Sequence, residues 1–128
     1  MSLGEVSASF DGGSFDLSTF AGGMEGLVSY AVGTWHCPVV IYSNPRILSS
    51  SNYNIEAYQE MVDVTQQIVD KWSDQGVSFL DLWNDEEFND ITAAERRLYM
   101  SDPVHPTMAG YKLWWTPKFE EYLYALEQ

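Results

Sequence analysis

Two residues near the C-terminal end of the chain have the types and the spacing needed for proton transfer. Asp102 stands three residues before His105, in a short segment that also contains Pro103 and Pro106. A carboxylate at this spacing can fold back and accept a hydrogen bond from one imidazole nitrogen, which fixes the ring tautomer. The other ring nitrogen is then free to act first as general base and afterwards as general acid. The spacing is thus compatible with the acid and base members of a catalytic triad, but Asp-x-x-His also occurs by chance in many proteins, so a solvated loop histidine is the alternative.

The nucleophile of such a triad is not evident in the sequence. Ser43, at the end of an apolar run, is the best placed serine, but no recognisable motif surrounds it. Cys37 is the only cysteine, which excludes an intrachain disulfide, and its position predicts a buried, unreactive thiol. Asp81 is expected to be a structural hydrogen-bond acceptor, because Asp102 already has the spacing of a triad acid.

Composition narrows the function classes further. A chain of 128 residues with 45% hydrophobic residues is long enough for one domain with a packed core. The formal net charge of -13 disfavours binding to nucleic acid or to an anionic membrane surface, since like charges repel. The acidic run 85–87 is expected to be solvated and matches no metal-site pattern, so neither a metal nor another cofactor is predicted.

The elements that must position Asp102 and His105 alternate between helix and strand. We expect a loop at 1–18 and a polar loop at 49–54. The helix and strand patterns cover residues 20–34 (helix), 39–42 (strand), 55–72 (helix), 77–83 (strand), 92–98 (short helix) and 107–126 (final helix). This order favours an α/β fold with parallel strands, in which helix 55–72 is the crossover. Two strands make a poor sheet, so the chain is predicted to belong to a larger one. Pro117 is expected to kink or split the final helix.

The block Asp102-Pro103-Val104-His105-Pro106, followed by Thr107, Gly110 and Tyr111, resembles the last conserved block of the SGNH (GDSL-type) hydrolases. In that family an Asp-x-x-His-Pro block leads into the C-terminal helix. Weaker resemblances of pattern lie at 19–23, 37–42, 58–72 and 79–82, so the likeness covers nearly all of residues 19–128. It implies a flavodoxin-like three-layer α/β/α fold in which the N-terminal strands are missing.

The nucleophilic Gly-Asp-Ser block of the family and its oxyanion-hole residues are absent from this sequence; Asn84-Asp85 lacks the required glycine. The resemblance thus implies the C-terminal portion of a serine esterase that acts on a small ester without a cofactor. Asp102 and His105 would belong to its triad, and this chain would be inactive alone. The missing neighbour of strand 39–42 would leave an open sheet edge, through which we expect self-association.

Two other function classes stay open. The first is a non-catalytic α/β module that binds a partner through an acidic, aromatic surface. The second is a flavodoxin-like receiver or cofactor domain, which is disfavoured because no glycine-rich loop for phosphate is present.

Overall fold

The computed structural model describes residues 15–48 and 53–127. The expected loop at 1–18 lies largely outside the described residues, as do residues 49–52 of the loop expected at 49–54. The described elements are α2 (Phe20–Trp35), β1 (Val39–Tyr42), α3 (Ile55–Trp72), η1 (Ser73–Gln75), β2 (Val77–Leu80), α4 (Glu86–Asn89), α5 (Ala93–Tyr99), α6 (Met108–Gly110), η2 (Tyr111–Trp115) and α7 (Thr116–Leu126). Their order confirms the expected alternation of helices and strands.

The two strands pair in parallel, as the sequence predicts. Val39 lies opposite Val77 and Tyr42 lies opposite Leu80, with α3 forming the connection between the strands. The second strand is shorter than predicted, because regular pairing ends at Leu80 rather than at Trp83. Leu82 and Trp83 are nevertheless fully buried, which accounts for their apolar character without strand geometry. The chain is therefore a mixed α/β structure with a two-stranded parallel sheet.

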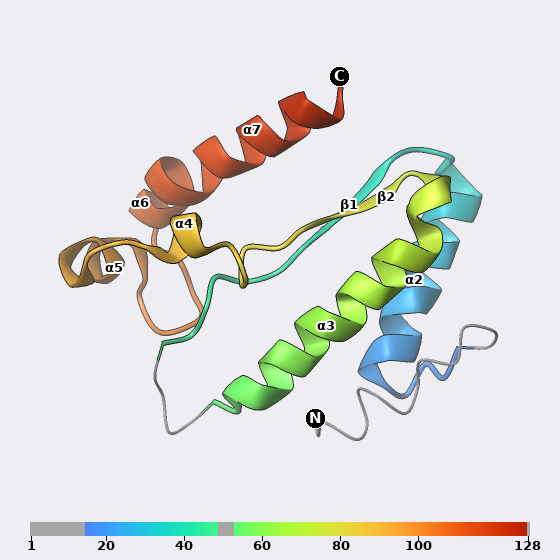
Figure 1. Cartoon of the computed structure of the whole chain (residues 1–128), viewed down its shortest axis with the longest axis horizontal. Coiled ribbons are helices and arrows are strands. Elements are labelled where there is room, and N and C mark those ends of the chain that lie inside the picture. Colours follow the sequence, from blue (N-terminus) through green and yellow to red (C-terminus); the bar gives the residue numbers. More distant parts are fainter. Residues whose placement is uncertain (1–14, 49–52, 128) are drawn as a thin grey trace.

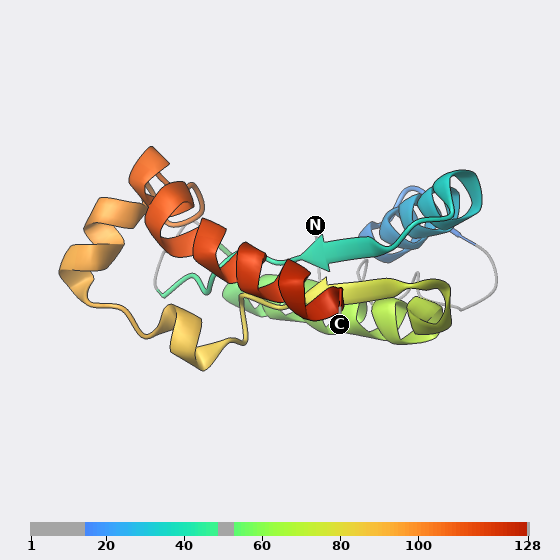
Figure 2. The ribbon, with the colours of Figure 1, turned by 90° about the horizontal axis from the view of Figure 1, so that it is seen from above.

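Helices cover both faces of this small sheet. In Figure 1, α2 and α3 lie on one side of the strands and α7 lies on the other, and Figure 2 shows α7 running over the sheet. One apolar cluster joins Val77 to buried residues of α2 and α3. A second cluster joins Leu80 to Trp114 and Trp115 on the opposite face. Alternate strand residues thus face two different cores, as expected for a parallel sheet with helices on both faces, although β1 itself is only partly buried.

The first two long helices are capped as their sequences suggest. The Thr19 side chain accepts a hydrogen bond from the N–H of Gly22, and the Asn54 side chain accepts one from Ala57. Between the helices, Glu25 of α2 is buried and bonds to Lys71 and to the indole N–H of Trp72 on α3. A buried charge needs such partners to offset its loss of water.

The C-terminal helix differs in part from its predicted form. It begins at Met108, since Thr107 is the capping residue, and its α-helical pattern is interrupted directly before Pro117, which stands in the first turn of α7, in agreement with the expected split. Directly before the proline, the segment η2 is a π-helix, in which the N–H and the hydroxyl of Thr116 both bond to the carbonyl of Tyr111. This wider turn lets the helix pass through the proline, which has no N–H to donate.

No helix within residues 15–48 and 53–127 combines the length and the apolar character needed to cross a lipid bilayer.

Candidate active site

The segment that carries Asp102 and His105 is a loop between α5 and α6, closed by backbone pairing at its base. Met100 and Pro106 form an antiparallel bridge across the loop. Inside it, the N–H and the hydroxyl of Ser101 both donate to the carbonyl of His105, at 2.8 and 2.9 Å. Pro106 therefore belongs to this closure rather than to the first turn of the final helix. These contacts close the loop around residues 102–104.

Asp102 organises the tip of the loop through both of its carboxylate oxygens. Oδ1 accepts the backbone N–H groups of Val104 and His105, each at 2.8 Å. Oδ2 lies 2.7 Å from Nδ1 of His105, so the hydrogen bond that the spacing predicts is present. With Nδ1 as donor to Asp102, Nε2 is the acceptor nitrogen, and within the described residues it has no partner. The imidazole side chain is 72% exposed.

These hydrogen bonds lower the pKa of Asp102, the bond from the Val104 N–H most of all and those from His105 in addition. The ionised carboxylate is the form that accepts all three bonds, so the fold favours it. The ionised Asp102 carboxylate contributes fully to the order of the loop above the ordinary aspartate pKa of about 3.9. This contribution is lost as the pH falls through the lowered pKa that Asp102 has in the folded chain.

We therefore expect the loop to stay ordered on acidification until the pH is below about 3.9. The amide signals of Val104 and His105, followed by NMR down to about pH 2, should then shift together with a midpoint below that value. Asp102→Asn should abolish this shared transition. A midpoint at or above the ordinary aspartate pKa would contradict the assignment.

Behind the loop, Gly110 permits close packing of the final helix against α5. A Cβ at this position would lie 2.1 Å from the carbonyl oxygen of Tyr99, which also accepts the N–H of Thr107. The loop base therefore requires glycine here for space rather than for an unusual backbone angle.

Gly110→Ala is expected to lower the free energy of unfolding by about 1–3 kcal/mol, because the backbone of Tyr99 must move. The matched control is Gly33→Ala in α2, where a Cβ would meet no atom of the described residues within 4 Å. That change should stabilise the chain by about 0.5–1 kcal/mol. Urea unfolding of both variants measures the two changes in the free energy of unfolding. Equal changes would contradict the close packing of Gly110 against the backbone of Tyr99.

Ser43 and Asp81 meet at the carboxyl ends of β1 and β2. The Ser43 hydroxyl lies 3.3 Å from Oδ1 of Asp81 and accepts the N–H of Trp83 at 3.0 Å. Asp81 also accepts the backbone N–H and the side-chain amide of Asn84, at 3.0 and 2.7 Å. Asp81 is thus the structural acceptor that the sequence predicts. Ser43 makes no hydrogen bond with His105, so the two do not form a nucleophile–base pair among the described residues.

Two predictions for polar residues outside the loop need correction. The thiol of Cys37 is exposed rather than buried, because His36 ends α2 in a left-handed conformation and Cys37 lies in the turn that follows. The run 85–87 is not simply solvated: Asp85 caps α4 and pairs with Lys118 at 2.8 Å. Residues 15–48 and 53–127 contain no cluster of three or more potential metal ligands.

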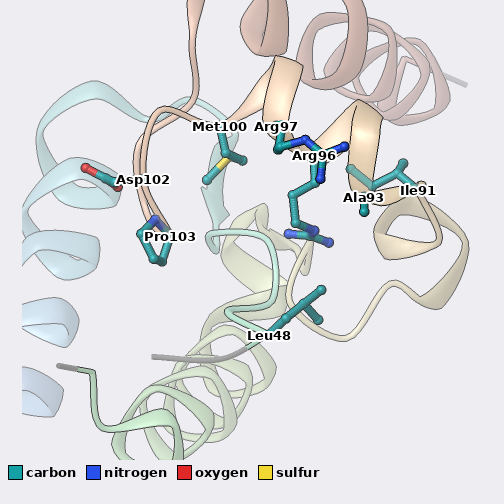
Figure 3. Close-up of a pocket in the computed structure, with 8 residues that line it drawn as sticks. All are labelled: Leu48, Ile91, Ala93, Arg96, Arg97, Met100, Asp102 and Pro103. Carbon is teal, nitrogen blue, oxygen red and sulfur yellow. The ribbon is translucent and has the colours of Figure 1, made fainter. Parts of the chain in front are cut away.

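A cavity of about 460 Å³ borders the loop and was not anticipated from the sequence. Figure 3 shows Asp102 and Pro103 on one side of it and side chains from the α5 region on the other. The lining residues are Leu48, Ile91, Ala93, Arg96, Arg97, Met100, Asp102 and Pro103. The feature of the sequence that could have indicated this cavity is the pair Arg96-Arg97, because two of only six basic residues are adjacent there.

Comparison of the chain with protein-family models, with curated proteins and with solved structures found no match.

Proposed function

We propose that this chain is the C-terminal portion of an SGNH-type serine esterase, in which His105 is the general base and Asp102 orients it. The observation that carries the proposal is the 2.7 Å contact between Asp102 Oδ2 and His105 Nδ1. Three features of a triad base support this role: a carboxylate that fixes the tautomer, an exposed ring, and a second nitrogen that has no partner among residues 15–48 and 53–127. In the proposed reaction, His105 removes the proton from a serine hydroxyl that attacks the ester carbonyl, and then protonates the leaving alcohol.

The arrangement of the helices is compatible with the larger sheet that the proposal requires. In a flavodoxin-like fold, the helices flanking the last two strands lie on one face and the final helix on the other. Here α2 and α3 share one face of the sheet, and α7 lies on the other (Figure 1). The 101–106 loop lies on the side to which the carboxyl ends of β1 and β2 point, where open α/β sheets bind ligands (Figure 1).

A serine-directed fluorophosphonate probe tests the proposal. The 128-residue chain alone should not be labelled in a manner that depends on His105. The protein encoded together with the upstream sequence should be labelled at a Gly-Asp-Ser serine roughly one hundred residues before Gly4, the distance that a five-stranded domain of ordinary size requires. An upstream sequence without such a serine would favour the non-catalytic module instead.

The proposal also implies that one side of β1 is an open sheet edge, with backbone N–H and C=O groups that no neighbouring strand pairs. The N–H of Val39 donates to the carbonyl of Gly76, directly before β2, at 3.0 Å, and the N–H of Ser43 donates to the carbonyl of Leu80 at 3.2 Å. In a parallel ladder alternate residues face opposite neighbours, so the backbone groups of Val40 and Tyr42 point away from β2. Among the described residues no strand pairs with that side. Such an edge is a template for pairing with another chain, and we propose that two copies associate through it.

Sedimentation at rising concentration should therefore show dimers or larger species, more so at high salt, because salt screens the repulsion between chains of charge -13. Val40→Pro removes an N–H that faces the open edge and not β2, so it should shift the chain towards monomer. Val40→Ala, which keeps the N–H, is the control for lost side-chain packing. A chain that is monomeric at all concentrations would contradict the open edge.

A further inference from the structure

The cavity beside the 101–106 loop combines an apolar lining with two cations. Leu48, Ile91 and Met100 are among the residues that supply its apolar surface, and Arg96 and Arg97 line it from the last turn of α5 (Figure 3). A volume of about 460 Å³ suits a small organic molecule. An apolar space with a few charged groups is the usual composition of a site that binds one class of small ligand.

Arg96 is half-buried, and within the described residues no carboxylate neutralises it. Its guanidinium donates to the carbonyls of Arg46 and Asn89, both at 3.4 Å, and lies over the ring of Trp114 at 5.7 Å. Burial lowers the pKa of Arg96, but an arginine side chain stays charged in a protein. Two long bonds use only part of its five N–H donors, so an uncompensated positive charge remains at the cavity wall.

Arg97, the next residue, is exposed and forms no ion pair within the described part of the chain. Lys71 and Lys118, by contrast, each pair with a carboxylate. A cation in the last turn of α5 interacts favourably with the helix dipole, which explains one basic residue near this end. It does not explain why two of the six basic residues of a strongly acidic chain line one apolar cavity.

Asp102 also lines the cavity, and its negative charge would repel an anion. Both of its oxygens are already occupied, however, by the N–H groups of Val104 and His105 and by the ring nitrogen of His105. These donors spread and offset the charge on the side of the cavity that belongs to the loop. The side formed by α5 carries the positive charge, so the cavity is polarised from one wall to the other.

We propose that this cavity binds a short aliphatic chain that ends in a carboxylate or a similar anion, with the anion at Arg97 and Arg96. The arginine fork matches a carboxylate, with which it can form two parallel hydrogen bonds. The opposite wall contains Asp102, the hydrogen-bond partner of His105, so the cavity adjoins the loop that carries the proposed base, although His105 itself does not line it. This assignment rests on the proposed function. The substrate of the proposed esterase would then be an ester with an anionic group on its acyl or alcohol part.

Binding can be measured on the 128-residue chain without any catalysis. Met100 lines the cavity and carries an ε-methyl group as a probe, whereas Met108 is 75% exposed and is not among the lining residues. Titration with hexanoate, followed in methyl NMR spectra, should move the Met100 signal with a Kd of about 1–10 mM and leave Met108 unchanged. Hexanol, with the same chain length and no charge, should bind at least about tenfold more weakly.

Arg97→Gln should weaken hexanoate binding by about tenfold and leave hexanol binding unaltered. The control is Lys112→Gln, which removes the same charge from an exposed position in η2 and should change neither ligand. The inference is overturned if Met100 does not respond to hexanoate, if hexanol binds equally well, or if the two variants behave alike.

The outcomes separate this inference from the proposed function. If the longer protein is an esterase, Arg97→Gln should lower kcat/KM for a carboxylate-bearing ester about tenfold relative to a neutral ester of equal length. Esterase activity without that preference would refute the substrate class alone. Arg97-dependent binding of hexanoate without any esterase activity would refute the proposed function and leave the anion site standing.

Discussion

Replacing His105 with alanine in the longer protein that we propose should lower kcat/KM for an acetyl ester on the order of 10⁴-fold. The reason is the proton path: without Nε2 of His105, the serine hydroxyl has no base, and the alkoxide leaving group has no acid. The remaining activity would come from binding and from the oxyanion hole. Steady-state hydrolysis of p-nitrophenyl acetate measures the loss.

Asp102→Asn should produce a loss of similar order while it preserves the shape of the loop. An asparagine oxygen can still accept the N–H groups of Val104 and His105, which Oδ1 of Asp102 now holds at 2.8 Å. Its amide group, however, would face Nδ1 of His105 as a donor and would favour the wrong tautomer. His36→Asn is the control, since His36 is the only other histidine, and asparagine tolerates its left-handed conformation.

Two results would contradict this mechanism. A longer protein that keeps full activity after His105→Ala would exclude His105 as the base. Hydrolysis by the 128-residue chain alone, abolished by His105→Ala, would place a nucleophile within these residues, and Ser43 would be the first serine to replace. The chain as described gives no support to that second result, because the Ser43 hydroxyl is held by Asp81 and Trp83.

Lys71→Met is expected to have the largest effect on stability, a loss of about 3–5 kcal/mol in the free energy of unfolding. Glu25, 1% exposed, bonds to Lys71 and to the Trp72 indole at 3.0 Å. Methionine preserves much of the aliphatic stem of lysine but removes the cation, which leaves a buried carboxylate with less compensation. A loss of this size is a large fraction of the 5–15 kcal/mol typical of a whole domain.

The matched control is Lys118→Met. Lys118 also pairs with a carboxylate, that of Asp85, but both side chains are partly exposed, so its loss should cost only about 0–1 kcal/mol. The double variant Glu25→Leu with Lys71→Met should recover most of the stability, since apolar groups can replace a buried ion pair. Chemical denaturation measures the free energy of unfolding of each variant. Equal losses for Lys71→Met and Lys118→Met would show that the burial of Glu25 does not increase the cost of removing its partner.

The sequence by itself determined the features that depend on near neighbours. The apolar period of α3 predicted its bounds, Ile55–Trp72, and the β-branched run predicted β1 and its parallel pairing. The contact between Asp102 and His105 was also predictable, because residues three apart in a tight loop can meet whatever surrounds them. At the start of α5, Thr92 and Glu95 each bond through the side chain to the backbone N–H of the other, and this capping box is local for the same reason, since the two residues are three apart. The catalytic role of the Asp–His pair stays a prediction.

Only the tertiary structure decided the features whose partners lie far along the chain. Strand β2 ends at Leu80 and Asp81 then bonds to Ser43, 38 residues away, while Lys71 meets Glu25 across 46 residues. The cavity brings Leu48 next to Arg96 and Arg97, although nothing in the sequence links them. Apolar runs and charge patterns specify that a residue is buried or solvated, but not which distant group it meets. That choice depends on how the helices pack on the sheet, so the exposed Cys37, the buried Glu25 and the arginine-lined cavity became visible only in the folded chain.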